Sequence, residues 1–126
     1  MNPVLLVGAF LGFLSVVIGA LSEHLLQHQV SQEVWRWVMT AIRYHQIGAV
    51  TITAIGLALS VTARPSTRLT RAAWVLSAGT VLFSFSIYAA AASGFEPLTY
   101  ITPFGGITLM VGWGLLAWAA WRPSEH

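Results

Sequence analysis

Residues 3–26 read PVLLVGAFLGFLSVVIGALSEHLL, an apolar run without a charged side chain before Glu23. A helix needs about 20 mostly apolar residues to cross the ~30 Å hydrocarbon core of a bilayer. The run therefore predicts a membrane-spanning helix. Because it lacks a basic segment at its start, we interpret it as a retained helix and not as a cleaved signal peptide.

The composition of the whole chain also indicates a membrane protein. The 126 residues are 56% hydrophobic and 8% charged, with a mean hydropathy of +0.73, which is far from a soluble domain of this length. The basic residues are six dispersed arginines, so the high isoelectric point is not a nucleic-acid footprint. The absence of cysteine excludes disulfides, iron–sulfur clusters and thiolate metal sites.

Three further apolar stretches follow the first, and each is long enough to cross a bilayer. The four predicted helices cover about residues 3–26, 35–61, 71–93 and 102–121. Short connections rich in Pro, Gly, Ser and Thr join them, so that consecutive helices run antiparallel. We expect a single all-α transmembrane domain over residues 1–126, folded as a four-helix up-down bundle.

The arginines predict the orientation of this bundle. Arg64, Arg68 and Arg71 lie between the second and third helices, and Arg122 follows the fourth helix on the same side. Most of the carboxylates lie on the opposite side. The positive-inside rule therefore places both termini in the cytoplasm, and the expected location is the inner membrane.

Small residues recur along the predicted helices at spacings of three or four. In lipid, a close approach of two backbones replaces the hydrophobic drive that water would supply, so such stripes predict helix contacts. The expected contact residues are Gly8, Gly12, Ser15 and Gly19 in the first helix and Gly105, Gly106 and Gly112 in the fourth. A tight bundle or a tight oligomer follows, although glycine is also common in membrane helices generally.

Polar side chains from all four predicted helices fall at one depth, in the outer half of the bundle. This predicted cluster consists of Glu23, His24, Arg43, Tyr44, His45, Ser84, Ser86, Tyr88 and Thr102. Arg43 is the most informative member, because an arginine at the centre of a membrane helix costs about 2.5 kcal/mol or more on insertion scales unless it snorkels or finds a partner. Glu23 is the carboxylate nearest to that depth, so we expect an ion pair. The alternative is an anion site at Arg43.

The histidines raise the question of a cofactor. His24 and His45 belong to adjacent predicted helices, and two such histidines can ligate a haem iron. However, the sequence contains no HExxH motif or histidine–carboxylate array, and lone histidines more often serve as hydrogen-bond partners. We therefore expect neither a cofactor nor a metal. Because no catalytic triad, phosphate loop or pair of catalytic carboxylates can be assembled, we also expect no enzymatic activity.

Four blocks of sequence resemble a known family. They are GALSEHL (19–25), RYHQIGAV (43–50), VLFSFSIYAAA (81–91) and YITPFGGITLMVGWG (100–114). In this order they are similar to the YgdD/YwdK-type family of small bacterial membrane proteins of unknown function. The last block is the most specific, since Thr102, Pro103, Gly105 and Gly106 match the family's TPxGG pattern. The resemblance implies four membrane helices and a membrane location, but no reaction.

We therefore expect a structural, accessory or interaction protein of the membrane. Its expected partners are the lipid bilayer and either further copies of itself or a larger membrane complex. The main alternative is an oligomer that transports a small polar solute or ion, because polar residues at membrane depth often mark pathways. The inner half of the predicted bundle has few polar groups, which argues against a continuous pathway.

Overall fold

The computed structural model describes residues 1–121, and within this range the chain is helical, without strands. The elements in chain order are α1 (Pro3–Leu21), η1 (Ser22–Leu26), α2 (Gln32–Ser60), α3 (Thr67–Thr80), η2 (Val81–Phe85), α4 (Ser86–Ser93), η3 (Glu96–Tyr100) and α5 (Thr102–Trp121). Two of them, η1 and η2, are single π-helical turns. The first continues α1, and the second joins α3 to α4 in one rod. Arg122, which entered the predicted orientation, lies outside the described residues.

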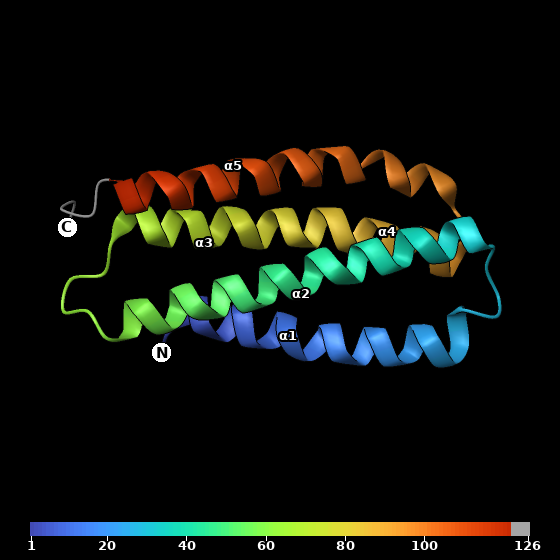
Figure 1. Cartoon of the computed structure of the whole chain (residues 1–126), viewed down its shortest axis with the longest axis horizontal. Coiled ribbons are helices and arrows are strands. Elements are labelled where there is room, and N and C mark those ends of the chain that lie inside the picture. The colour runs from blue at the N-terminus through green and yellow to red at the C-terminus, as the bar shows by residue number, and fades with distance from the viewer. Residues whose placement is uncertain (122–126) are drawn as a thin grey trace.

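Four rods lie side by side along the long axis of the molecule: α1, α2, the α3–η2–α4 rod and α5 (Figure 1). The start of α1, the α2–α3 connection and the end of α5 lie at one end, and the α1–α2 connection and η3 lie at the other. Among residues 1–121, three segments are long and apolar enough to cross a membrane, namely Pro3–Leu26, Thr67–Ser93 and Glu96–Trp121. The 29-residue α2 is long enough but less apolar.

Side-chain caps determine where the helices begin. Asn2 accepts a hydrogen bond from the Leu5 amide, and Pro3 occupies the first helical turn of α1, where its missing N–H is not needed. The serines Ser31 and Ser66 cap α2 and α3 in the same way. Because of these caps, α2 and α3 begin at Gln32 and Thr67, earlier than the predicted starts at 35 and 71.

Glycines allow α1 and α2 to approach backbone to backbone. A Cβ atom added to Gly8 would lie 2.6 Å from the Thr53 amide nitrogen, and one added to Gly56 would lie 2.6 Å from the Leu5 Cα. Both distances are too short for a real contact, so any side chain at either position would force these two helices apart.

The second close pair is α3 and α5. A Cβ on Gly79 would lie 2.8 Å from the Leu109 amide nitrogen, one on Gly112 would lie 2.7 Å from the Leu76 side chain, and Gly105 faces the Phe83 backbone in η2. The contact between α2 and α3 joins this pair to the α1–α2 pair, whereas α2 and α5 hardly touch. The two helix pairs therefore leave an opening between α2 and α5.

Other residues of the predicted packing stripes lie in looser surroundings. Ser15 is buried, and a Cβ on Gly12 would make an ordinary 3.8 Å contact with Ala49. Gly106 would similarly lie 3.8 Å from the Phe83 ring, and a Cβ on Gly19 would meet nothing within 4 Å. The structure thus places the tight contacts at Gly8, Gly105 and Gly112 and not at every small residue of the stripes.

Candidate functional site

Among the ionisable side chains of the predicted cluster, that of His45 is the most deeply buried, with 0% of its surface exposed. Its Nε2 atom lies 2.8 Å from the Leu11 carbonyl oxygen in α1, and its Nδ1 atom lies 2.9 Å from the Tyr88 hydroxyl in α4. Gly48, one turn further along α2, allows this approach because it packs directly on Thr80 of α3. His45 thus connects three of the four rods.

The partners of His45 define its tautomer. A carbonyl oxygen only accepts hydrogen bonds, so Nε2 must carry the proton and donate to Leu11. In the neutral ring Nδ1 is then an acceptor, and the Tyr88 hydroxyl donates to it. Both ring nitrogens are therefore engaged, and neither has a free lone pair for a haem iron or another metal.

Two serines of the central rod make further interhelical bonds, one to α2 and one to the remaining rod, α5. Ser84, fully buried in the π-helical turn η2, donates a 2.7 Å hydrogen bond to the Ala41 carbonyl of α2. The Ser86 and Thr102 hydroxyls lie 2.6 Å apart and join α4 to α5. In the part of the chain that the structure describes, His45, Ser84, Ser86, Tyr88 and Thr102 form a network, which we call the hydrogen-bond belt, that ties all four rods together at one depth.

Aromatic rings surround the belt. The His45 ring centroid lies 5.3 Å from that of Phe85 and 5.8 Å from that of Tyr88. Tyr44, which the sequence also placed in the cluster, points away from the belt and is 44% exposed. Its ring instead contacts Phe83 edge to face, with centroids 5.2 Å apart.

The charged members of the predicted cluster do not join the belt. Glu23 and His24 lie in η1 and are exposed, and Arg43 is exposed on α2. No ion pair between Glu23 and Arg43 forms within residues 1–121, so the predicted bridge across the first two helices is absent. The inward positions at this level are occupied by the buried neighbours Ser22 and His45, which leaves Glu23 and Arg43 on exposed faces of their helices.

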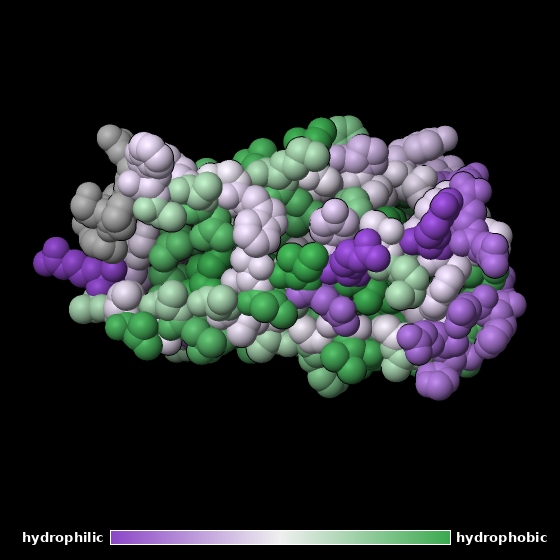
Figure 2. All heavy atoms as spheres, in the orientation of Figure 1, coloured by the Kyte–Doolittle hydropathy of each residue, from purple (hydrophilic) through white to green (hydrophobic). Residues whose placement is uncertain are grey.

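Arg43 and Arg36 lie instead on one outward stripe of α2. They stand on either side of Thr40 at spacings of four and three, which places all three residues on one helix face. Hydrophilic side chains lie on this face of α2, in the half toward the α1–α2 connection (Figure 2). Neither arginine side chain has a hydrogen bond or ion pair among the residues that the structure describes, although the Arg36 backbone carbonyl accepts a hydrogen bond from the Thr40 hydroxyl.

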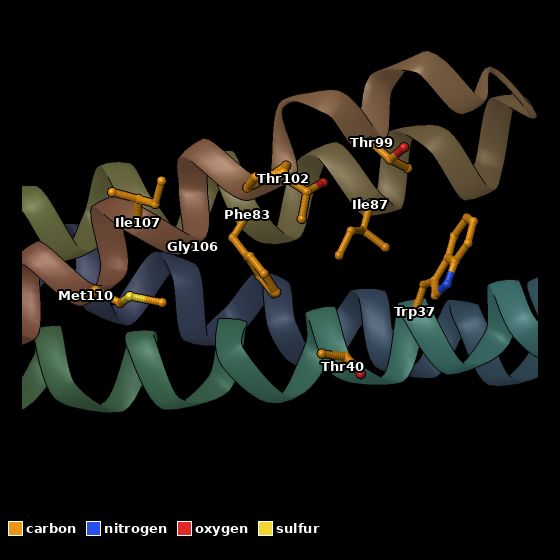
Figure 3. A pocket seen from close by; sticks show the side chains of 10 residues that line it. Trp37, Thr40, Phe83, Ile87, Thr99, Thr102, Gly106, Ile107 and Met110 are labelled. Atoms are coloured by element: carbon orange, nitrogen blue, oxygen red, sulfur yellow. The ribbon is translucent and has the colours of Figure 1, made fainter.

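A groove opens beside this stripe, between α2 and α5 (Figure 3). Its volume is about 580 Å³, and Phe83 and Ile87 of the central rod form its floor. The walls are Trp37 and Thr40 of α2, Thr99 of η3, and Thr102, Pro103, Gly106, Ile107 and Met110 of α5. The groove lies along the flank of the rods, and its lining is mostly apolar.

Sequence reasoning missed most of this groove. Phe83, Ile87, Ile107 and Met110 are apolar residues of apolar helices, and their pattern does not distinguish a groove from a core. The sequence did single out Thr102, as a member of the predicted cluster, and Gly106, because two adjacent glycines leave the first turns of α5 bare. Within residues 1–121, no group of three His, Cys, Asp or Glu side chains is placed to hold a metal ion.

Long apolar helices tied together by buried hydrogen bonds define a helical integral membrane protein. The family model described as "Protein of unknown function (DUF423)" matches residues 18–106. The chain belongs to this family, which confirms the resemblance found in the sequence.

Relatives with similar lengths are also named as membrane proteins. The chain is 32% identical to the UPF0382 inner membrane protein YgdD of Escherichia coli (strain K12), over 94% of this chain and 88% of the relative. It is 30% identical to a UPF0382 membrane protein of Haemophilus influenzae over 98% of both chains, and 29% identical to YwdK of Bacillus subtilis over 95% and 97%. No solved structure matches the chain. The protein is thus an inner-membrane protein with several membrane-spanning helices.

Proposed function

We propose that this protein is a non-catalytic accessory protein of the inner membrane that binds a membrane-embedded ligand in the groove between α2 and α5. The observation that carries the proposal is the groove itself. Its volume of about 580 Å³ is in the range of ligand sites, and its lining is apolar with a few hydroxyl groups. Because it lies along the flank of membrane helices, its occupant comes from within the bilayer.

The proposal includes a bundle in which all four rods cross the membrane. The 29 residues of α2 extend about 43 Å, more than the hydrocarbon thickness. This helix packs along α1 and contacts α3, both of which belong to segments apolar enough to span. A path for α2 outside the bilayer would break these contacts, so α2 is the fourth span despite its two arginines.

Charge placement supports an orientation with both termini in the cytoplasm. Arg64, Arg68 and Arg71 lie in or next to the α2–α3 connection, at the same end of the molecule as the start of α1. Arg68 also lies over the Trp118 ring, with its guanidinium carbon 4.0 Å from the ring centroid. Tryptophan and arginine together are typical of the membrane interface. The end that carries Arg36 then faces the outer leaflet.

The belt supports a non-catalytic role. His45 and Ser84 each bond to a backbone carbonyl of another helix, and Ser86 bonds to Thr102. The histidine and serine side chains, which are residue types used in catalysis, are thus engaged in holding the helices together. No titratable residue lines the groove. Binding without chemistry, and without a cofactor, is the function that this arrangement supports.

Photolabelling of the protein in lipid nanodiscs tests the proposal. The probe is a phosphatidylcholine with a photoreactive acyl chain, and labelled residues are located by mass spectrometry. Met110 in the groove and Phe13 on α1 are both well exposed, at 73% and 63%. We expect label at Met110 to exceed label at Phe13, because a groove retains an acyl chain longer than a convex helix surface does.

Two glycines of α5 provide a matched pair of variants. Gly106→Leu places a side chain in the groove, whereas a side chain at Gly114 meets nothing within 4 Å. Gly106→Leu is expected to reduce the label at Met110 to the level at Phe13, and Gly114→Leu is expected to leave it unchanged. Equal label at Met110 and Phe13 in the unmodified protein would contradict the proposal.

A further inference from the structure

We infer that the occupant of the groove is an anionic phospholipid, with its phosphate bound by Arg43 and Arg36 and an acyl chain lying along Phe83 and Met110. This inference rests on the proposed function and specifies its ligand. The observation behind it is that Arg36 and Arg43 border the rim of an apolar groove and that neither is ion-paired among the described residues, although Glu33 lies three residues before Arg36 on the same helix face. A molecule with a charged head and an apolar tail is complementary to both the arginines and the groove.

The positive charge of Arg43 has no counter-charge within residues 1–121. This side chain is exposed on α2, eleven residues and so about 16 Å from the start of the helix. An arginine this far along a membrane helix is unfavourable unless its guanidinium reaches the headgroup level or finds a counter-charge. Within residues 1–121, no carboxylate pairs with it: Glu23 is exposed on η1, and Glu33 shares the outward face of α2 but lies ten residues from Arg43, about 15 Å along the helix. Any counter-charge for Arg43 therefore comes from outside the chain.

The Arg43 side chain reaches toward the headgroup level of the bilayer. Helical side chains lean toward the N-terminus of their helix, and for α2 this is the end with Trp35 and Trp37. The Arg43 guanidinium is thereby directed toward the headgroup level, where interfacial tryptophans lie. Arg36 follows on the same stripe about 10 Å further out. Both cations are thus placed at the depth of a phosphate and not at the centre of the bilayer.

The groove lies directly beside the two arginines. Thr40 lines the groove and lies between the two arginines along the helix, so the cationic stripe borders the groove wall. From there the apolar lining runs along Phe83, Ile107 and Met110. Guanidinium groups bind phosphate oxygens with two parallel hydrogen bonds, and phosphate is the anionic group found at the headgroup level of a bilayer. A phospholipid provides both groups in one molecule.

A competition experiment tests the inference. The whole protein in a mild detergent receives equal amounts of phosphatidylglycerol and phosphatidylcholine with identical acyl chains, and native mass spectrometry counts the adducts. The bound phosphatidylglycerol is expected to exceed phosphatidylcholine by about fivefold, the factor that one basic residue near a membrane surface contributes. Arg43→Gln is expected to bring the ratio close to one, and Arg43→Lys to retain part of the preference.

Arg64→Gln is the matched control, because it removes one exposed arginine in the connection at the other end of the molecule and should leave the ratio unchanged. If Arg43→Gln does not fold, Arg36→Gln is measured in its place and is expected to lower the ratio. A ratio near one in the unmodified protein, or one that Arg43→Gln does not change, would overturn the inference. Such a result with preserved acyl labelling of the groove would leave the proposed function standing. Loss of that labelling would overturn both.

A second copy of the chain is the competing occupant. If dimers without bound lipid dominate the native mass spectrum, and Gly106→Leu converts them to monomers, the groove is a protein interface and the phospholipid site is wrong. Lipid adducts on single chains that Gly106→Leu removes would support the inference.

Discussion

His45 and Arg43 lie two residues apart on α2 and occupy opposite situations. His45 is fully buried, and both of its ring nitrogens are hydrogen-bonded to neighbouring rods. Arg43 is exposed and has no partner among the described residues. A polar side chain that faces the bundle stabilises the fold, whereas one that faces outward requires a partner from elsewhere. The difference assigns stability to one face of α2 and binding to the other.

The largest effect on the buried face is expected for His45→Ala. The substitution removes two interhelical hydrogen bonds and leaves a cavity, so the free energy of unfolding should fall by about 2–4 kcal/mol. Unfolding in mixed detergent micelles measures this change. His28→Ala is the control, because His28 is exposed and its loss should change stability little. Equal effects of the two substitutions would contradict the role of the belt.

Gly48→Leu is expected to have the next largest effect. A side chain at this position would meet the Thr80 hydroxyl and separate α2 from α3, at a cost of about 1–3 kcal/mol. Gly19→Leu makes the same chemical change where no atom lies within 4 Å of the new Cβ. The same unfolding assay compares the two variants, and a stable Gly48→Leu protein would show that this face is less tightly packed than described.

Tyr88→Phe tests the belt with a smaller change. The variant retains the ring and removes only the hydroxyl that donates to His45, so a loss of about 1 kcal/mol is expected. Thermal unfolding in detergent detects this as a lower midpoint. Tyr44→Phe removes the hydroxyl of an exposed tyrosine outside the belt and should leave the midpoint unchanged. If the two midpoints are the same, the hydroxyl contributes nothing to the belt.

The smallest stability effect is expected for Arg43→Gln. Because Arg43 has no partner in the folded chain, the free energy of unfolding in lipid-free detergent should change by no more than about 0.5 kcal/mol. Added phosphatidylglycerol should stabilise the unmodified protein more than the variant, since a ligand stabilises only the state that binds it. A large loss of stability without lipid would mean that Arg43 belongs to the fold, and the contrast with His45 would disappear.

The sequence predicted where the helices lie along the chain and that several polar groups share one level of the bundle, because both follow from counting residues along a helix. A bilayer requires about 20 apolar residues per span, and each residue advances about 1.5 Å. Counting placed His45, Ser84 and Tyr88 at one level, and the structure brings them together. The starts of α2 and α3 were less accurate because Ser31 and Ser66 extend these helices at their caps.

Rotation about the helix axis could not be predicted in the same way. The π-helical turn η1 begins at Ser22, directly before Glu23, and η2 contains Ser84. Each such turn changes the direction of the side chains that follow it, and no residue pattern in the sequence marks its position. For this reason the levels of Glu23 and Arg43 suggested an ion pair, whereas the structure leaves both side chains exposed and unpaired within residues 1–121. The groove was missed because its apolar lining resembles a core.

Native mass spectrometry of the unmodified protein, extracted from its own membrane in a mild detergent without added lipid, tests the central claim most directly. The account predicts the mass of the 13.6 kDa chain with a bound phospholipid that Gly106→Leu removes. Bare chains alone, or a second polypeptide in place of lipid, would contradict it.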